Sequence, residues 1–524
     1  MTEPLAGPGA IHDTPMSRTP VDLLIIGGGV NGAGIARDAA GRGLKVLLCE
    51  RDDLSQGTSS RSGKLIHGGL RYLEHYEFRL VRKALIEREI LLRAAPHIIW
   101  PMRFVLPHSP EQRPAWLIRL GLFLYDHLGG RRLLPPSQSL DLASAPEGDG
   151  IKPAFRRAFV YSDCWVDDSR LVVLNALDAA ERGATILPRT TCLGARREDG
   201  LWQVTLQDRA SGRRFEVRAT CLVNAAGPWV EDVLGRVAGA NRRSRMRLVK
   251  GSHIVTRKFW HGDHAYLLQN DDRRVVFVNP YEGDLALIGT TDVAVDGTPD
   301  EAEVTEDEIV YLLRVVARYF QNAPGRGDVR QAFTGVRPLF DDAAAHASAV
   351  TRDYVFDLEP ARPSTDHPPL LSIFGGKLTT YRKLAEHALE RLAPFLSELA
   401  PPWTADAALP GGEIANADFP QYLRALEDRY SWLPDGLAHH YGRLYGSRTH
   451  SLLSGAEGPA DLGRHFGGRL YEREARYLIE QEWARSAEDI LDRRSKHGLH
   501  LSAEQRADLA AWLECEGRSW AESA

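Results

Sequence analysis

The chain opens with apolar runs whose spacing predicts a β-strand, a helix and a second strand. Residues 22–26 form an apolar run of strand type, and residues 30–41 combine helix-forming side chains with glycines suited to close packing. A second apolar strand is expected at residues 45–49. This order predicts one βαβ unit of a parallel sheet.

A glycine motif joins the first predicted strand to the helix. Gly27, Gly29 and Gly32 have the GxGxxG spacing, which lets bare backbone approach a pyrophosphate at the helix N-terminus. Glu50 follows the second strand, where a carboxylate accepts hydrogen bonds from a ribose 2′-hydroxyl. The alternative is a tight turn without a ligand. We favour a dinucleotide site, and because Glu50 would repel a 2′-phosphate, we expect NAD or FAD.

Beyond this unit the apolar period switches between helix and strand. Helices are expected at residues 80–95 and 167–182, and residues 185–224 alternate as in a β-meander. Strand alternation continues over residues 245–352 around a helix near 306–320. The later stretch therefore predicts a mostly antiparallel second domain.

A second ligand-facing turn is predicted after these strands. Residues 372–392 contain a short strand, the pair Gly375-Gly376 and a helix that begins at Thr379 or Thr380. This arrangement would aim another helix N-terminus at the ligand. After Pro401 the apolar residues recur at helical spacing, so we expect an all-helical C-terminal domain.

Composition narrows the class of protein. The 524 residues carry 65 Lys and Arg against 70 Asp and Glu, a net charge of −5, which argues against broad nucleic-acid binding. The 5 cysteines are scattered and lack CxxC spacing, so no disulfide framework is predicted. The first twenty residues lack the apolar core of a signal peptide and are expected to be a disordered leader. We therefore expect a cytoplasmic protein or one that lies on the membrane from that side.

An apolar and aromatic tract between residues 100 and 136 admits two interpretations. Its second half has a helical period, with arginines at its edges. The tract would form either a helix packed on its own core or an amphipathic surface segment that binds a membrane interface.

Histidines of the C-terminal part are candidate metal ligands by residue type. A metal site needs carboxylates or thiolates nearby, and we do not expect these histidines to have such company at helical spacing. No metal site is predicted, and the histidines are expected to be ordinary surface or core residues. They are His439, His440, His450, His465, His497 and His500.

A polar loop follows Glu50 and is rich in Ser, Thr and Gly. Such loops are usually solvated turns. A dinucleotide laid across the sheet edge would nevertheless pass over this segment, which places Thr58, Ser59, Arg61 and Lys64 within reach of phosphate, ribityl or ring atoms.

Several longer motifs resemble those of the FAD-dependent, quinone-linked glycerol-3-phosphate dehydrogenases. They are RSGKLIHGGLRY (61–72), NAAGPW (224–229), KGSH (250–253), GVRP (335–338), GGKLTT (375–380) and WARSAEDIL (483–491), beside residues 27–50. The resemblance runs from about residue 21 to the last helices. It implies FAD-dependent oxidation of sn-glycerol 3-phosphate to dihydroxyacetone phosphate, with electrons passed to a membrane quinone. It also implies peripheral association with the cytoplasmic membrane, and it leaves open whether the protein forms a homodimer.

The implied fold is α/β, with a discontinuous Rossmann-like FAD-binding domain, a mixed or antiparallel substrate domain and an all-α C-terminal domain. We assign residues 21–90, 160–240 and 353–400 to the first, 91–159 and 241–352 to the second and 401–524 to the third. The cofactor contacts that the resemblance adds are Leu65, Gly227, Gly375, Gly376, Lys377, Leu378 and Thr379.

Oxidation of a secondary alcohol by flavin needs a group that takes the hydroxyl proton. His253 and His67 are the candidates, and we favour His253. A phosphate calls for permanently charged forks, and those beside the motifs are Arg71, Arg337 and Arg352, with Tyr72 next to the first. Lys377 is expected near the flavin N1 and C2 carbonyl, where it would stabilise the reduced ring.

Three other functions share some of these features. An oxidase that passes electrons to oxygen and releases hydrogen peroxide shares nearly all the motifs. A flavin-binding protein without turnover would be expected to lack the arginine forks. An amino-acid oxidase would need an arginine for a carboxylate but no further cations.

Overall fold

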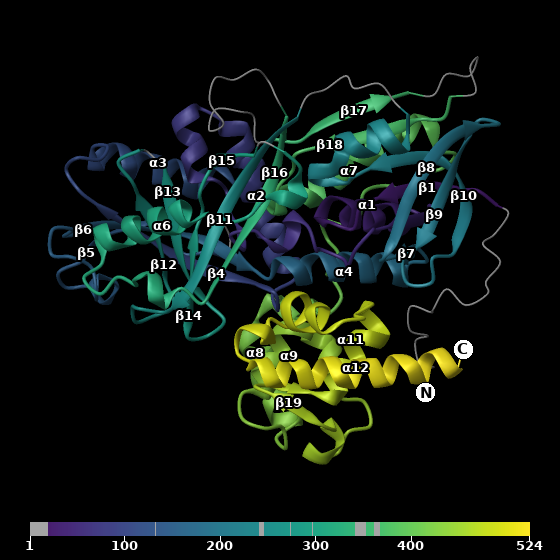
Figure 1. Cartoon of the computed structure of the whole chain (residues 1–524). Coiled ribbons are helices and arrows are strands. Elements are labelled where there is room, and N and C mark those ends of the chain that lie inside the picture. The colour runs from purple at the N-terminus through teal and green to yellow at the C-terminus, as the bar shows by residue number, and fades with distance from the viewer. Residues whose placement is uncertain are drawn as a thin grey trace.

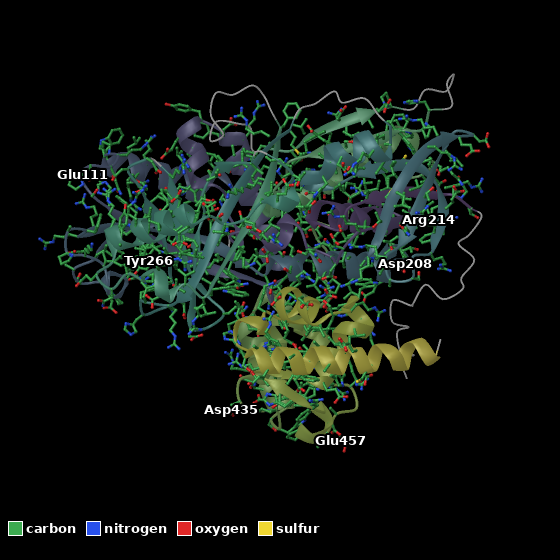
Figure 2. All side chains as sticks on the ribbon, viewed as in Figure 1. Glu111, Asp208, Arg214, Tyr266, Asp435 and Glu457 are labelled. Atoms are coloured by element: carbon green, nitrogen blue, oxygen red, sulfur yellow. The ribbon has the colours of Figure 1, made fainter. Side chains whose placement is uncertain are left out.

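The computed structural model describes residues 19–130, 133–239, 246–272, 274–295, 297–340, 353–360 and 367–523. Two sheets lie side by side in a large body, and the C-terminal helices form a separate domain below it (Figure 1). Asp435 and Glu457 mark the end of this domain that is remote from the body (Figure 2). The predicted leader lies largely outside the described residues.

The first sheet has the strand order β17-β18-β10-β1-β2-β7. β1 pairs in parallel with β2 and β10, and Leu23, Leu24 and Ile25 have no exposed surface, as expected for a strand covered on both faces. The strands are β1 (Val21–Ile26), β2 (Val46–Cys49), β7 (Thr185–Leu187), β8 (Thr190–Glu198), β9 (Leu201–Asp208), β10 (Arg214–Asn224), β17 (Val355–Glu359) and β18 (Leu370–Phe374). The predicted meander is confirmed for β8, β9 and β10, which pair antiparallel.

Three helices stack beside the first sheet. α1 (Val30–Gly41) packs against α4 (Asp168–Glu181) on one side and α7 (Tyr381–Leu392) on the other. Gly34 is required there, because a Cβ at this position would lie 2.7 Å from the ring of Tyr381. The βαβ unit is therefore confirmed, and it positions the helix N-terminus at the carboxyl edge of β1.

The second sheet has the order β15-β11-β14-β13-β12-β4-β6-β3 and is mostly antiparallel, as predicted. Its strands are β3 (Leu65–Ile66), β4 (Ile99–His108), β5 (Gln138–Asp141), β6 (Arg157–Val166), β11 (Met246–Arg257), β12 (Ala265–Gln269), β13 (Val275–Tyr281), β14 (Leu285–Gly289), β15 (Val293–Ala294) and β16 (Gln331–Phe340). Helix α6 (Glu306–Tyr319) covers its apolar face. The boundary expected at residue 160 passes through β6, which belongs wholly to this sheet.

The C-terminal domain is built from α8 (Phe419–Arg429), α9 (Leu437–Tyr445), α10 (Thr449–Leu452), α11 (Glu472–Glu482) and α12 (Ala503–Ser523). It is not entirely helical, because β19 (His465–Gly467) and β20 (Leu470–Tyr471) form a hairpin. Its core is separate from the cores of the two sheets.

Buried ion pairs join this domain to the body. Arg170 of α4 pairs with Glu482 of α11, and both side chains have no exposed surface. Arg494 donates to both carboxylate oxygens of Asp53 at 2.8 Å, and this pair is also fully buried. Burial alone would raise the pKa of Asp53, but Arg494 and Arg493 outweigh it and lower the pKa to about 2.

Helices α2 (Phe78–Ala94) and α3 (Ala115–Leu128) pack together at the edge of the second sheet. Within α3 only Leu122 and Tyr125 are buried, whereas Trp116, Leu120 and Phe123 are 69%, 47% and 56% exposed. The tract thus combines a packed side with an exposed apolar side. In the described part of the chain, every helix is too short or too polar to cross a membrane.

Candidate active site

A cavity of about 1300 Å³ is lined by residues of both sheets. On one side lie the ends of β1 and β2 with the turn into α1, and on the other lie β11, β13 and β14. Of the described residues, the lining includes nearly all those predicted to bind cofactor or substrate. It comprises Gly27, Gly29, Glu50, Thr58, Ser59, Arg61, Leu65, His67, Arg71, Tyr72, Gly227, His253, Arg337, Gly375, Gly376, Lys377, Leu378 and Thr379.

The glycines of the first turn are fixed by space and by backbone conformation. Gly27 has a φ of +116°, and a Cβ there would lie 2.5 Å from the carbonyl oxygen of Ala225. A Cβ at Gly32 would lie 1.9 Å from the carbonyl oxygen of Gly27. Gly32 does not line the cavity and acts by letting α1 pack against the turn. Bare backbone is thereby brought to the cavity, as a pyrophosphate site requires.

Glu50 stands at the end of β2, as the sequence predicts. Its carboxylate accepts hydrogen bonds from the backbone amides of Gly28 (2.6 Å) and Asp52 (2.9 Å). Partial burial raises the pKa of Glu50, and the two amide donors oppose that shift. The carboxylate lines the cavity, and its role as the acceptor for a ribose hydroxyl stays a prediction.

The polar loop after Glu50 is held against both sheets. Ser59 Oγ accepts from the backbone amide of Val30 at 3.0 Å, and Thr58 Oγ1 donates to the carbonyl oxygen of Val336 in β16 at 2.6 Å. The expectation for Lys64 is wrong, because its side chain does not line the cavity. Its ammonium is buried and donates to Asp168 Oδ1 at 2.8 Å, an ion pair that orders the loop against α4.

The second glycine turn follows β18. Gly375 and Gly376 have φ values of +77° and +106°, and Asn31 of α1 donates to the carbonyl oxygen of Gly375 at 3.1 Å. Lys377 comes next, with its Nζ 4.1 Å from the ring centroid of Tyr72. This turn therefore brings a cation to the lining of the cavity, and the position of Lys377 beside the flavin stays a prediction.

His253 lies on β11 and is 3% exposed. Its ring stacks on Phe333 with centroids 5.2 Å apart, and Gly289 is required beside it, because a Cβ there would lie 2.1 Å from His253 Cδ2. Burial lowers the pKa of His253 to about 3, and the charges of Arg337 and Lys64 add to the shift. The imidazole is therefore neutral at physiological pH and has a lone pair to accept a proton.

Arg337 lies on β16, which pairs with β11. Its Nη1 forms an ion pair with Asp292, and its Nη2 donates to Thr290 Oγ1 at 3.1 Å. The absence of a side chain at Gly251 makes space for this guanidinium, because a Cβ there would lie 2.4 Å from Arg337 Nη2. The guanidinium is thus oriented by its neighbours within the same chamber as His253.

The remaining predicted residues occupy different places. Thr379 Oγ1 accepts from the amide of His67 at 3.1 Å, which ties the two predicted loops together. Arg71 lines the cavity, and within the described chain its side chain forms no ion pair. Arg352 lies outside the described residues. Sequence reasoning missed Asn279 of β13, Thr290 and Asp292, whose positions depend on strand register.

The cavity joins a glycine-lined dinucleotide groove to a chamber that contains a neutral imidazole and an oriented guanidinium. This combination is typical of a redox enzyme that uses a bound dinucleotide. Comparison with protein families agrees: residues 22–382 match the family described as FAD dependent oxidoreductase. Residues 402–513 match the C-terminal domain of alpha-glycerophosphate oxidase. The chain belongs to the FAD-dependent oxidoreductases.

Curated relatives match nearly the whole chain. It is 60% identical to the D-erythritol 1-phosphate dehydrogenase of Brucella abortus, covering 94% of this chain and 97% of that protein. It is 53% identical to a glycerol-3-phosphate dehydrogenase of Pseudomonas aeruginosa (94% and 95% covered). It is 50% identical to the aerobic glycerol-3-phosphate dehydrogenase of Escherichia coli (94% and 97%).

A solved structure extends the likeness to the fold. The glycerol-3-phosphate dehydrogenase of Bacillus halodurans complexed with FAD is 27% identical, with a TM-score of 0.72 and 96% of this chain and 95% of that chain covered. FAD is thus the cofactor, and the site fits it: the bare backbone at Gly27 and the carboxylate of Glu50 face the groove. Of the two dinucleotides left open by the glycine motif, FAD is confirmed and NAD is not.

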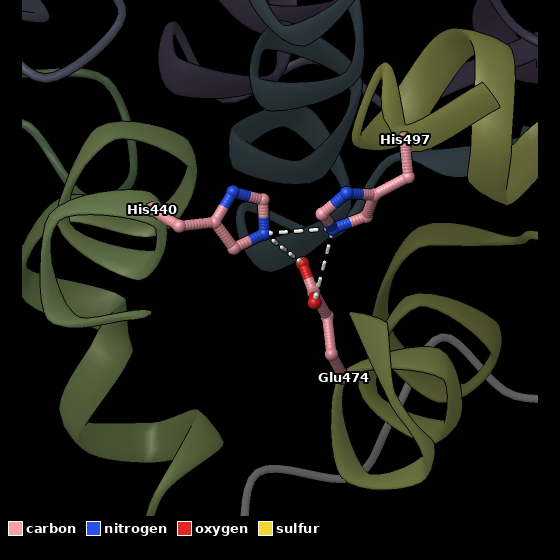
Figure 3. Close-up of side chains that lie close together, drawn as sticks. All are labelled: His440, Glu474 and His497. Atoms are coloured by element: carbon pink, nitrogen blue, oxygen red, sulfur yellow. Dashed lines mark hydrogen bonds and ion pairs between the residues drawn. The ribbon is translucent and has the colours of Figure 1, made fainter. Parts of the chain in front are cut away.

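Two histidines of the C-terminal domain are core residues that lie close to a buried carboxylate. His440, Glu474 and His497 converge, with their ligating atoms within 4.8 Å of one another (Figure 3). Spacing within one helix could not indicate this cluster, because the three residues come from separate elements.

Proposed function

We propose that the protein oxidises the secondary hydroxyl of a short polyol phosphate, with sn-glycerol 3-phosphate as the substrate and dihydroxyacetone phosphate as the product. The observation that carries the proposal is the shared chamber of His253 and Arg337 beside the dinucleotide groove. The names of relatives at 50% and 53% identity support the same substrate.

Each residue has a distinct part in this proposal. FAD supplies the acceptor for the hydride that leaves the carbinol carbon. His253 takes the hydroxyl proton on its neutral ring, and His67 is the alternative base. Arg337 and Arg71 hold the phosphate dianion, with Tyr72 beside them, and Arg352 stays a prediction. A bound dianion would also favour the protonated form of His253, which raises its strength as a base above that of the free site.

D-erythritol 1-phosphate is a second candidate substrate. It is favoured by the relative at 60% identity that bears its name. It is also a polyol phosphate with secondary hydroxyls, one carbon longer than glycerol 3-phosphate. The same cation and base would serve either compound, so the length of the polyol is the property to test.

The test is a comparison of kcat/KM with an artificial dye as acceptor. The substrates are sn-glycerol 3-phosphate, D-erythritol 1-phosphate, glycerol and erythritol. The proposal predicts turnover of at least one phosphate and negligible turnover of both free polyols. A tenfold preference corresponds to about 1.4 kcal/mol in the transition state and would settle the substrate. Equal rates with and without phosphate would refute the phosphate role of Arg337.

A membrane quinone is the proposed electron acceptor, and oxygen is the alternative. Reduction of a short-chain quinone should be much faster than formation of hydrogen peroxide under air. Peroxide formed in equal amount to the substrate consumed would instead identify an oxidase.

The proposed membrane contact is the exposed apolar side of α3. Trp116 and Phe123 would insert their exposed rings into the interfacial region of a membrane. The double variant Trp116→Ser, Phe123→Ser should lose binding to anionic vesicles in a flotation assay and keep dye reductase activity. Val310→Ser on α6, which is 51% exposed, is the matched control. Unchanged flotation of the double variant would exclude α3 as the contact.

A further inference from the structure

Three ligating side chains meet in the core of the C-terminal domain, away from the FAD cavity. His440 belongs to α9, Glu474 to α11, and His497 to the short 3₁₀ turn His497–Leu499. Figure 3 shows both imidazoles turning their Nε2 atoms toward the carboxylate. All three residues are buried, at 9%, 0% and 5% exposure.

The spacing of the ligating atoms matches a small tetrahedral cation. His440 Nε2 lies 2.9 Å from Glu474 Oε1 and 3.1 Å from His497 Nε2, and His497 Nε2 lies 3.7 Å from Glu474 Oε2. Bonds of about 2.0–2.1 Å in a tetrahedron place ligand atoms about 3.3 Å apart. The observed separations fall on both sides of that value, so modest side-chain rotation would equalise them.

Hydrogen bonds within this cluster leave some of its acceptor atoms without a donor. A proton on His440 Nε2 would be shared between Glu474 Oε1 and the lone pair of His497 Nε2. Glu474 Oε2 is buried and accepts no hydrogen bond within the described structure. A buried carboxylate oxygen without a donor is costly, whereas a divalent cation would use all of these lone pairs.

We propose that His440, Glu474 and His497 bind Zn²⁺. Two imidazoles and one carboxylate are a ligand set that zinc prefers, with the fourth position left to water. Tyr445 donates to Glu474 Oε1 at 2.7 Å and would orient the carboxylate, as outer hydrogen bonds do around metal ligands.

The position of this centre gives it a structural role. Lys496, next to His497, donates to Ser169 of α4 at 3.1 Å. Glu482, on the same helix as Glu474, pairs with Arg170 of α4. The metal would therefore lock three segments of the C-terminal domain in the arrangement that contacts the body.

The test is metal content and cobalt spectroscopy of the FAD-loaded, full-length protein. After incubation with Zn²⁺ and gel filtration, about one zinc per chain is expected, with a higher Tm than after treatment with a chelator. Replacement by Co²⁺ should give the visible absorption bands of a tetrahedral site. Glu474→Gln should lower the zinc content below about a tenth of that value, and the exposed His465→Asn should not.

Tyr445→Phe separates a metal site from a mere hydrogen-bonded cluster. Loss of this outer partner should weaken zinc binding about 10–100-fold, and Tyr471→Phe serves as the control. Less than about a tenth of a zinc per chain in the parent, with no cobalt bands and no change in Tm, would overturn the proposal. Because the cobalt spectrum is recorded on the parent protein, the decision stands even if Glu474→Gln fails to fold.

Discussion

The FAD cavity and the interface between the body and the C-terminal domain differ in how their charged side chains are paired and exposed. In the cavity Arg337 pairs with Asp292 but its side chain stays 29% exposed, and His253 Nδ1 has no hydrogen-bond partner within the described structure, so both side chains can still bind a ligand. At the interface Asp53 and Arg494 are fully buried and satisfy each other. The charged groups of the cavity are therefore available to a ligand, whereas those of the interface are bound to one another. Substitutions in the cavity should change activity, and substitutions at the interface should change stability.

The largest effect is expected for Asp53→Asn. This change leaves the buried guanidinium of Arg494 without its hydrogen-bonded counter-charge and also removes the charge that pairs with Arg493, which costs about 3–5 kcal/mol. Chemical denaturation of the holoenzyme should show that loss. Glu216→Gln, in an exposed pair with Arg196, should leave the free energy of unfolding nearly unchanged, because solvent screens that pair. A similar small cost for Asp53→Asn would mean that water reaches Arg494 and that the interface is not sealed.

Arg337→Lys should change the kinetics and leave the stability nearly intact. A point charge cannot reproduce the planar fork, so a charge-assisted hydrogen bond worth about 1.5–3 kcal/mol is lost. The KM for the phosphate substrate should rise about 10–100-fold while the flavin content stays the same. Arg257→Lys on β11, outside the cavity, is the control. Unchanged steady-state constants would remove Arg337 from the phosphate site.

His97 offers a subtler test, because it is a buried imidazole in the joint between the two regions. It is packed between the body and the turns at Gly411 and Gly446, and neither ring nitrogen has a hydrogen-bond partner within the described structure. Burial lowers the pKa of His97 to about 3, and the charges of Arg170 and Arg443 add to the shift.

The sign of the pH dependence follows from that lowered pKa. The unfolded chain binds the proton below pH 6.5 and the folded chain does so only near pH 3, so stability falls as pH decreases through this window. At pH 5 the protonation of His97 in the unfolded chain lowers the free energy of unfolding by about 2 kcal/mol relative to its value above pH 7. His97→Met should therefore show a smaller fall in Tm between pH 7 and pH 5 than the parent. An equal fall in both proteins would show that His97 is already hydrated.

The sequence predicts residues of the FAD cavity better than it predicts the ion pairs of the interface. Gly27 and Glu50 could be assigned because a βαβ unit is contiguous, and His253 and Arg337 lie in motifs that resemble a known family. Their shared chamber depends on the pairing of β11 with β16, which periodicity does not fix.

The partners in long-range ion pairs and hydrogen bonds could not be predicted. Asp53 and Arg494 are separated by 441 positions, and His440 and His497 by 57. The expectation that Lys64 contacts the cofactor is wrong for the same reason, because its partner, Asp168, is 104 positions away. Local patterns thus locate the groove, and only the folded chain shows which charges are already satisfied.

The most direct test of the account is the flavin absorbance of the purified protein under anaerobic conditions. We predict that the oxidised flavin band is bleached by sn-glycerol 3-phosphate or D-erythritol 1-phosphate, and that neither glycerol nor erythritol bleaches it. In Arg337→Lys, the difference in bleaching between the phosphorylated and the free polyols should be smaller than in the parent when the substrate concentration is limiting. A flavin band that neither phosphate bleaches, or that the free polyols bleach equally well, would contradict the account.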